Sequence, residues 1–166
     1  VDNVLFSADK KTIYYYPAYL NAASYQIPSG VTSVADQAFQ YAENLRTVAI
    51  PSTVTSLGNK AFQYCENLRT VVIPKSVKTI GTYLFSDCPA LESVTFESGS
   101  KLKKLSDRII YNDVSIRSFT VPDGVTDIGT YAFSRSGVKT VNFPASVTSI
   151  GGNAFAYCTD LTDVNF

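Results

Sequence analysis

The chain has 166 residues, 45% of them hydrophobic, and this apolar content over this length predicts one folded unit with a buried core. Its 14 basic and 14 acidic side chains give a formal net charge of zero, which excludes a general attraction to nucleic acid or to an anionic membrane surface. The absence of histidine excludes Ser-His and Cys-His nucleophile pairs, HExxH zinc sites and histidine pH switches. Most familiar hydrolytic and metal-dependent activities are therefore excluded.

The apolar runs of the chain are short. Those ending at Tyr16 and Ile73 have the length of strands and lie far below the ~20 residues of a membrane span, so we expect no membrane insertion in this segment. The chain opens at Val1 without a signal-peptide layout and stops at Phe166, on the last position of a repeat. We expect it to be a fragment or a mature segment of a longer protein.

A repeat of about 23 residues begins at Ile27. Marker prolines recur at steps of 23, 23, 48 and 22, namely at Pro28, Pro51, Pro74, Pro122 and Pro144. The step of 48 predicts a divergent unit at about residues 97–121, with a two-residue insertion at Ser98 and Gly99. With this insertion its apolar residues fall in phase with their neighbours: Leu102, Leu105, Ile109, Ile110, Ile116, Phe119 and Val121.

Each unit contains a predicted strand that a proline ends. Around Val48 and Ile50 the β-branched content and the alternation indicate a short strand with these two side chains inward. Pro51 ends it, because proline has no N–H for further ladder bonding. A second extended piece runs from Val54 to Leu57 and meets a turn at Gly58.

The end of each unit has the spacing of a short helix that buries one face. In the second unit this spacing is set by Ala61, Phe62, Cys65 and Leu68. One unit of 23 residues cannot bury its own apolar side, so the units are expected to stack as a solenoid. Stacking predicts a continuous spine formed by Phe39, Phe62, Phe85, Ile110, Phe133 and Phe155.

The resulting consensus is IPxxVxxIGxxAFxxCxxLxxV, which resembles the BspA-like leucine-rich repeats of bacteria. The resemblance implies an α/β-type solenoid, a curved right-handed superhelix with short parallel strands on the concave side and short helical or irregular convex segments. It also implies an N-terminal capping coil at residues 1–26, with a turn at Asp9 and Lys10, before a solenoid of about six repeats at residues 27–166. The family is usually secreted or surface-anchored, so the expected location is extracellular or at the cell surface.

Cys65, Cys88 and Cys158 occupy one consensus position, where Ala42 and Ser136 also occur. The position therefore favours a small buried side chain, and we expect buried free thiols. Cys65 and Cys88 lie on adjacent coils and are candidates for a disulfide, whereas Cys158 has no neighbour to pair with.

The outward positions of the concave strands are small and neutral, and a partly basic row precedes them. The candidate ligand-binding residues there are Arg46, Arg69, Arg117, Lys139, Thr47, Thr70, Thr95, Thr120 and Asn142. Two interpretations stay open for the basic row: a surface for an acidic protein or glycan patch, or a solvated rim.

Tyrosine is common in the chain, and Tyr41 and Tyr64 follow the spine Phe by two positions. Tyrosine and arginine are enriched at binding hot spots, so both residues are candidates for ligand contact. The alternative is a ring packed on its neighbours with its hydroxyl in water.

The leading functional hypothesis is a non-catalytic, adhesion-type interaction module that binds a host protein or glycan through its concave face. The alternative is a structural spacer or targeting repeat domain of a larger protein. We expect no enzymatic activity, no cofactor, no metal site and no nucleic-acid partner.

Overall fold

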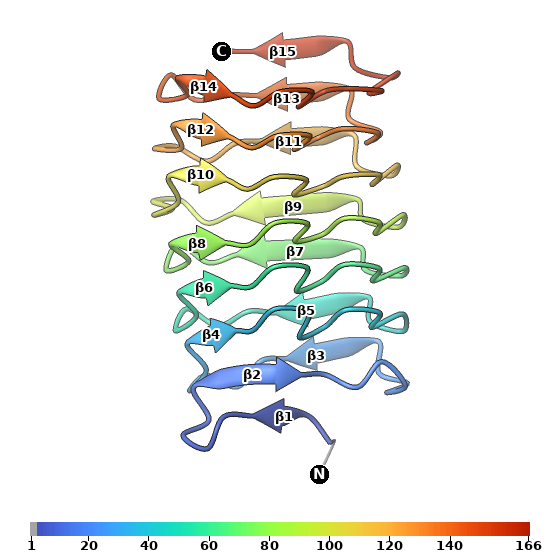
Figure 1. The fold of residues 1–166 in the computed structure, drawn as a ribbon, viewed down its shortest axis with the longest axis vertical. Coiled ribbons are helices and arrows are strands. Elements are labelled where there is room, and N and C mark those ends of the chain that lie inside the picture. The colour runs from blue at the N-terminus through green and yellow to red at the C-terminus, as the bar shows by residue number, and fades with distance from the viewer. Residues whose placement is uncertain (1–2) are drawn as a thin grey trace.

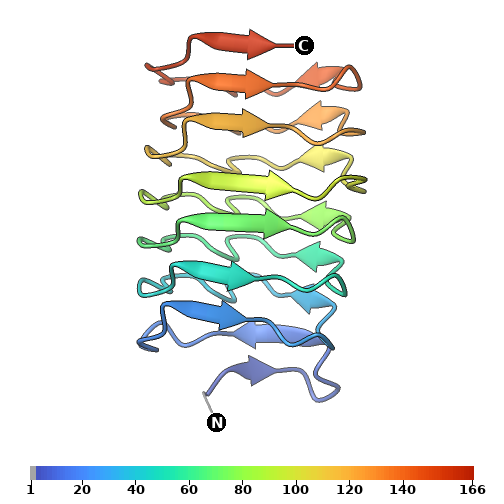
Figure 2. The same ribbon diagram turned by 180° about the vertical axis from the view of Figure 1, so that it is seen from behind.

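The computed structural model describes residues 3–166 as a stack of coils in which each coil adds one strand to each of two faces (Figure 1). The strands of one face, here called the long-strand face, have three or four residues. They are β3 (Ser24–Gln26), β5 (Thr47–Ala49), β7 (Thr70–Ile73), β9 (Ser93–Phe96), β11 (Ser118–Thr120), β13 (Thr140–Asn142) and β15 (Asp163–Asn165). Figure 2 turns this face to the front.

The opposite face, here called the short-strand face, consists mostly of two-residue strands. They are β2 (Thr12–Tyr15), β4 (Ser33–Val34), β6 (Ser56–Leu57), β8 (Thr79–Ile80), β10 (Lys104–Leu105), β12 (Asp127–Ile128) and β14 (Ser149–Ile150). Neighbours pair in parallel from β2 to β8 and from β10 to β14, whereas β1 (Leu5–Phe6) pairs antiparallel with β2 at the N-terminal end. The stack therefore has about seven turns.

The strand register confirms the predicted alternation. Thr47 pairs with Thr70, and Thr70 pairs with Ser93, so equivalent positions of successive units form columns. Val48 and the equivalent valines of the next two strands are buried, while Thr47 and Thr70 are exposed.

The predicted helix between the short and the long strand of each unit is wrong, because the described residues contain no helix. The residues from Gly58 to Arg69 form turns, in which alternate N–H groups from Lys60 to Tyr64 donate to the next coil instead of four residues back. Phe62 N–H donates to the carbonyl of Leu84 at 3.0 Å, and Tyr64 N–H donates to that of Ser86 at 3.1 Å. We call this and the equivalent stretches the turn segments.

Two residues of each turn segment have positive φ, which lets every second N–H reach the next coil. The pairs are Gln37 and Tyr41, Lys60 and Tyr64, Tyr83 and Asp87, Arg108 and Asn112, Tyr131 and Arg135, Asn153 and Tyr157. Positive φ is unfavourable for residues with a side chain, so the bonds between coils must offset a cost at each of these positions.

The predicted spine is confirmed. Phe39 stacks on Phe62 at 5.0 Å between ring centroids, Phe62 on Phe85 at 5.5 Å, and Phe133 on Phe155 at 5.0 Å. Ile110 is buried between the two aromatic runs. Offset stacking contributes about 0.5–1.5 kcal/mol per pair beyond the area buried.

Both faces are interrupted at the divergent unit. On the long-strand face, β3, β5, β7 and β9 form one sheet and β11, β13 and β15 form another. On the short-strand face, β8 and β10 are likewise not paired with each other within residues 3–166. The turn segments stay connected at this level, since Phe85 N–H donates to the carbonyl of Ile109 at 3.0 Å. The backbones of these two coils are thus hydrogen-bonded through the turn segments but not through the strands of either face.

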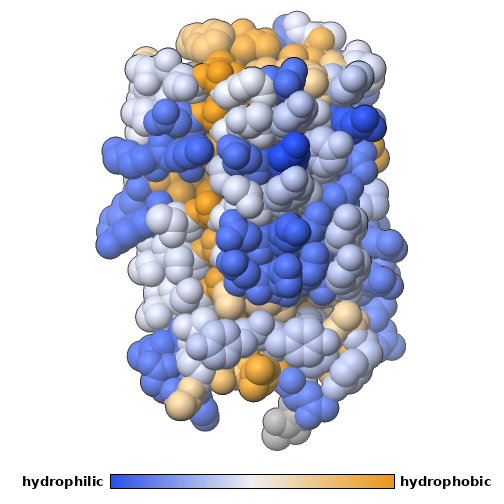
Figure 3. All heavy atoms as spheres, viewed as in Figure 1, coloured by the Kyte–Doolittle hydropathy of each residue, from blue (hydrophilic) through white to orange (hydrophobic). Residues whose placement is uncertain are grey.

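The last coil exposes apolar side chains at positions that, in the other coils, are covered by the following coil. Phe166 is 79% exposed, and Ile150 and Val164 are also exposed. Figure 3 shows this apolar surface at the upper end, where β14 and β15 lie. Within residues 3–166 no helix is long and apolar enough to cross a membrane.

Candidate functional site

The outward side chains of the long-strand face form two columns of mostly small polar groups. One column contains Thr47 and Thr70, and the other contains Thr95, Thr120 and Asn142, as their register requires. Among the described residues, no hydrogen bond uses the hydroxyls of Thr47, Thr70 or Thr95. These hydroxyls are available to a ligand.

The C-terminal part of the second column is bonded within itself. Asn142 Nδ2 donates to Thr120 Oγ1 at 3.2 Å, and Asn165 Nδ2 donates to Asn142 Oδ1 at 2.8 Å. Such a ladder across parallel strands stabilises the sheet and leaves fewer free polar groups for a partner.

The basic row lies directly before the long strands, but two of its four cations are paired. Arg69 forms an ion pair with Glu92 at 2.9 Å, and Arg117 forms one with Asp160 at 2.7 Å. Arg46 and Lys139 have no ion pair with any other described residue. All four side chains are exposed, so each pair contributes at most about 1 kcal/mol, and the positive field of the row is weaker than the sequence indicates.

Tyr41 and Tyr64 lie on the turn segments and not on the long strands. Their rings stack at 4.9 Å with an interplanar angle of 9°. The structure brings these two candidates together with each other, on a different part of the coil from the threonine columns.

A second aromatic row on the turn segments was missed from the sequence. The Arg108 guanidinium lies between the rings of Tyr83 and Tyr131, at 5.0 and 4.6 Å from their centroids. Lys60 lies over the other side of this row, 5.6 Å from the Tyr83 ring. The repeat does contain a signal for this row, because Lys60, Tyr83, Arg108 and Tyr131 occupy one repeat position. The incorrect prediction of a helix did not show that these side chains point the same way.

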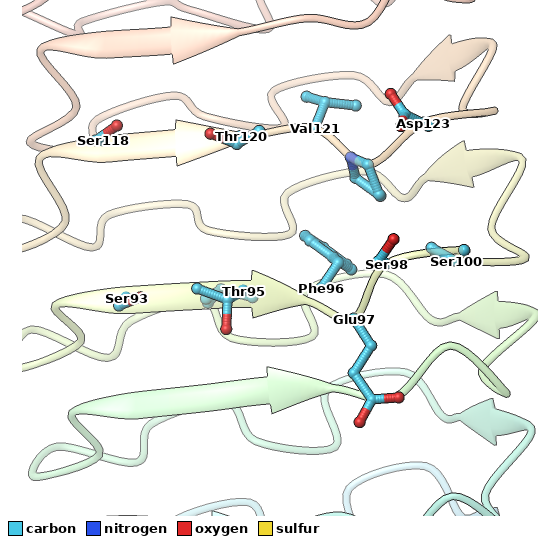
Figure 4. A pocket seen from close by; sticks show the side chains of 13 residues that line it. Ser93, Thr95, Phe96, Glu97, Ser98, Ser100, Ser118, Thr120, Val121 and Asp123 are labelled. Carbon is cyan, nitrogen blue, oxygen red and sulfur yellow. The ribbon is translucent and has the colours of Figure 1, made fainter.

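Two cavities open on the long-strand face. One, of about 510 Å³, is lined by β3, β5 and β7, including Tyr25, Thr47 and Val72. The other, of about 550 Å³, lies at the interruption between β9 and β11 (Figure 4). Glu97 lines both cavities, so they adjoin at this residue.

The consensus cysteine position forms a buried column inside the stack. The thiols of Cys65 and Cys88 donate to the carbonyls of Phe39 and Phe62 in the preceding coil, at 3.2 and 3.1 Å. Burial raises the pKa of the Cys88 thiol well above its usual range and also raises the pKa of Cys158. Cys65 and Cys88 are buried free thiols as predicted, whereas Cys158 is only partly buried.

Asp113 takes the cysteine position in the divergent coil and is fully buried. Its Oδ1 accepts a hydrogen bond from Cys88 N–H at 2.7 Å, while Oδ2 has no hydrogen-bond partner. Burial raises the pKa of this carboxyl well above its usual range.

No three Cys, Asp or Glu side chains within residues 3–166 are placed to hold a metal ion. Ser106, the one hydroxyl next to a lysine pair in the divergent unit, donates to the carbonyl of Gly81 at 2.5 Å and is buried. Its hydroxyl has a structural partner.

Solved structures of bacterial proteins share the fold. A leucine-rich cell surface protein of Faecalibacterium prausnitzii is 29% identical, with 99% of this chain and 38% of that chain covered and a TM-score of 0.70. A leucine-rich repeat protein of Eubacterium ventriosum is 26% identical, with 100% and 38% covered and a TM-score of 0.69. A leucine-rich repeat protein of T. pallidum is 24% identical, with 98% and 78% covered and a TM-score of 0.87, and supports the fold alone.

The chain spans 38% of the length of the first two of these proteins. A comparison with curated proteins finds no significant match. The model of the BspA type leucine rich repeat region matches in six copies, over residues 11–139 and 100–166. The chain therefore belongs to the BspA-type leucine-rich repeat family.

Proposed function

We propose that residues 1–166 act as a non-catalytic, adhesion-type interaction module of a bacterial surface or secreted protein. In this proposal a host protein or glycan binds to the long-strand face, the side that the sequence analysis assigns to the concave side of a curved solenoid. The supporting observation is that this face carries two adjoining cavities and the free hydroxyls of Thr47, Thr70 and Thr95. The extracellular or surface location is part of the proposal and is supported by the name of the Faecalibacterium relative.

Affinity on such a surface would come from many modest contacts on a preformed scaffold. The side chains project from strands whose backbones are bonded to neighbouring coils, so little conformational entropy is lost when a ligand binds. Arg46 and Lys139 supply unpaired positive charge at one edge of this face. Charge of this kind increases the association rate with an acidic partner more than it increases the affinity.

The test is a host-glycoprotein and glycan array probed with the protein and with a charge-reversed variant. Arg46→Glu, Arg69→Glu and Arg117→Glu together should weaken binding of any ligand of the long-strand face. A matched control reverses three exposed lysines that precede short strands, Lys11→Glu, Lys78→Glu and Lys103→Glu, and should bind normally. If the protein binds no component of the array at low or at physiological salt, the proposal is wrong.

The second candidate function is a structural spacer or targeting domain of a larger protein. It is favoured by the polar groups that satisfy each other on the same face, namely the Arg69–Glu92 and Arg117–Asp160 ion pairs and the Asn165–Asn142 bond. A spacer would give an empty array, and a replacement by an unrelated solenoid of equal length would preserve the activity of the full protein.

A further inference from the structure

The interruption of the stack at the divergent coil has a specific cause. β7 and β9 begin 23 residues after β5 and β7 respectively, whereas β11 begins 25 residues after β9. The two additional residues fall in the loop at Ser98 and Gly99, which lies beside the interruption (Figure 4). The insertion thus lengthens the loop that borders the cavity of about 550 Å³, while the cavity of about 510 Å³ lies over regular coils without such a loop.

A second change keeps the short-strand face open at the same level. Ser106 takes the position of Gly58, Gly81 and Gly129, at which a Cβ would lie only 2.3–2.4 Å from the backbone of the preceding coil. A serine there requires more space between coils than the paired strands leave, and its hydroxyl donates to the carbonyl of Gly81 across this level. The loss of strand pairing therefore coincides with two features of the divergent unit, the insertion and this serine, while the turn segments keep the coils attached.

The walls of this cavity combine hydroxyls with an apolar floor. Serine and threonine hydroxyls come from both strand edges and from the inserted loop, namely from Ser93, Thr95, Ser98, Ser100, Ser118 and Thr120. The partly buried Phe96 supplies the accessible apolar part, since Val121 and Pro122 also line the cavity but are buried (Figure 4). The volume lies within the usual range of small-ligand sites.

The charges of the lining disfavour an anionic ligand. No lysine or arginine lines the cavity, whereas Glu97 and Asp123 do. The Glu97 carboxylate turns toward the preceding coil and accepts a hydrogen bond from Lys75 N–H at 3.0 Å. Carboxylate and hydroxyl groups together are good partners for the hydroxyl groups of a neutral ligand.

The spacing of the two strands argues against an inserted peptide strand. Cα atoms of β9 and β11 approach to within 8 Å of one another. A strand placed between them would need about 9.6 Å, twice the normal strand spacing. The ligand is therefore compact, rich in hydroxyls and provided with an apolar face.

From this combination we infer that the gap between β9 and β11 is a binding site for a neutral saccharide. The ring hydroxyls bond to the serine and threonine hydroxyls, and the C–H face of the sugar packs against Phe96. The second cavity adjoins at Glu97 and offers the exposed apolar side chain of Val72, so further sugar units extend across β7 and β5. This inference rests on the proposed function and names its ligand class.

The test is an NMR titration of the ¹⁵N-labelled protein with neutral trisaccharides: maltotriose, cellotriose, mannotriose and chitotriose. We expect at least one of them, at up to about 10 mM, to shift the amide signals of residues 93–100 and 118–123. Thr95→Arg fills the gap from an exposed position and should raise the Kd at least about tenfold. Asn165→Arg, in the same column but outside the cavity, should leave the Kd unchanged.

Three results would overturn the inference: no shift with any of the sugars, shifts confined to other residues, or equal binding by Thr95→Arg. Ser98→Arg, in the exposed inserted loop, repeats the test if the spectrum of Thr95→Arg loses its dispersion. If the array described above finds a protein ligand while every sugar fails, the interaction module stands and only the saccharide site is wrong.

Discussion

Asp113 and Cys88 are joined across two coils by a hydrogen bond from the Cys88 N–H to the Asp113 carboxyl, 2.7 Å long. The carboxyl is fully buried, and its second oxygen has no hydrogen-bond partner. The buried column at the consensus cysteine position therefore contains one ionisable carboxyl where the preceding coil has a thiol. This carboxyl affects the stability of the protein and the dependence of that stability on pH.

We expect Asp113→Asn to stabilise the protein at neutral pH by more than about 1.4 kcal/mol, the free energy of one pKa unit, because burial raises the pKa of Asp113 well above its usual range. The amide keeps an acceptor for Cys88 N–H and cannot ionise. Since burial raises the pKa of Asp113 in the folded state, the wild type loses stability relative to the variant as pH rises above about 3.9, the value in the unfolded chain. Urea unfolding between pH 3.5 and 8 measures this difference.

The pH dependence distinguishes this explanation from a general effect of removing charge. In acid, where Asp113 is protonated in both states, wild type and Asp113→Asn should converge. Glu66→Gln, at an exposed position, should give the wild-type profile over the whole range. A constant difference between wild type and Asp113→Asn at every pH would show that ionisation of Asp113 is not involved.

The three thiols should react with a thiol reagent in two classes. Cys158 is partly exposed and should react in the folded protein, slowly because burial raises its pKa and lowers its thiolate fraction. Cys65 and Cys88 should react only as fast as the protein unfolds, since both are buried and donate to carbonyls. A thiol titration with and without urea measures this, and rapid reaction of all three would contradict it.

The sequence was sufficient for the phase of the repeat and for the face of each strand. The alternation of Val48 and Thr47 with their equivalents predicted the columns that the register confirms. The insertion at Ser98 and Gly99 was also predicted, because the proline steps record its length. These features can be predicted from the sequence because the repeat shows each of them several times.

The conformation of the turn segments and the presence of the cavity could not be predicted from the sequence, for physical reasons. The spacing of Ala61, Phe62 and Cys65 suits a helix and equally suits a turn whose N–H groups bond to the next coil, so the pattern does not reveal the acceptor. The basic row was overestimated for a similar reason, because Asp160 reaches Arg117 from a turn segment nearly two repeats away in sequence. Contacts between coils depend on the stacking, which one unit alone does not encode.

The guanidinium of Arg108 should matter more than that of Arg135. Arg108 lies between two tyrosine rings, Tyr83 and Tyr131, with a third, Tyr111, farther away at 5.9 Å, whereas Arg135 lies over Tyr157 at 5.1 Å. At about 0.5–1 kcal/mol per cation–π contact, Arg108→Ala should cost about 1–2 kcal/mol. Arg135→Ala is the matched control, since both residues have positive φ in the same kind of turn, and it should cost about half as much.

Urea unfolding at low and high salt measures both losses. Arg108→Lys keeps the charge but not the planar group that stacks between two rings, so it should recover only part of the stability. Equal losses for Arg108→Ala and Arg135→Ala would show that the two-ring arrangement contributes nothing beyond a single contact.

Gly81→Ala should destabilise the stack by about 1–3 kcal/mol, because the added methyl group overpacks against fixed backbone. The position of the new Cβ lies 2.3 Å from the Asn59 nitrogen and 2.4 Å from the Gly58 carbonyl carbon, neither of which can move without breaking bonds between coils. Gly152→Ala is the control, since its Cβ meets nothing within 4 Å, and it should leave stability unchanged within about 0.5 kcal/mol. Urea midpoints compare the two variants.

Because close approach of the coils is the cause, Gly81→Ala should also speed hydrogen exchange at the N–H of Gly81, which donates to the carbonyl of Leu57 at 2.8 Å. Unchanged exchange at this N–H would contradict the explanation.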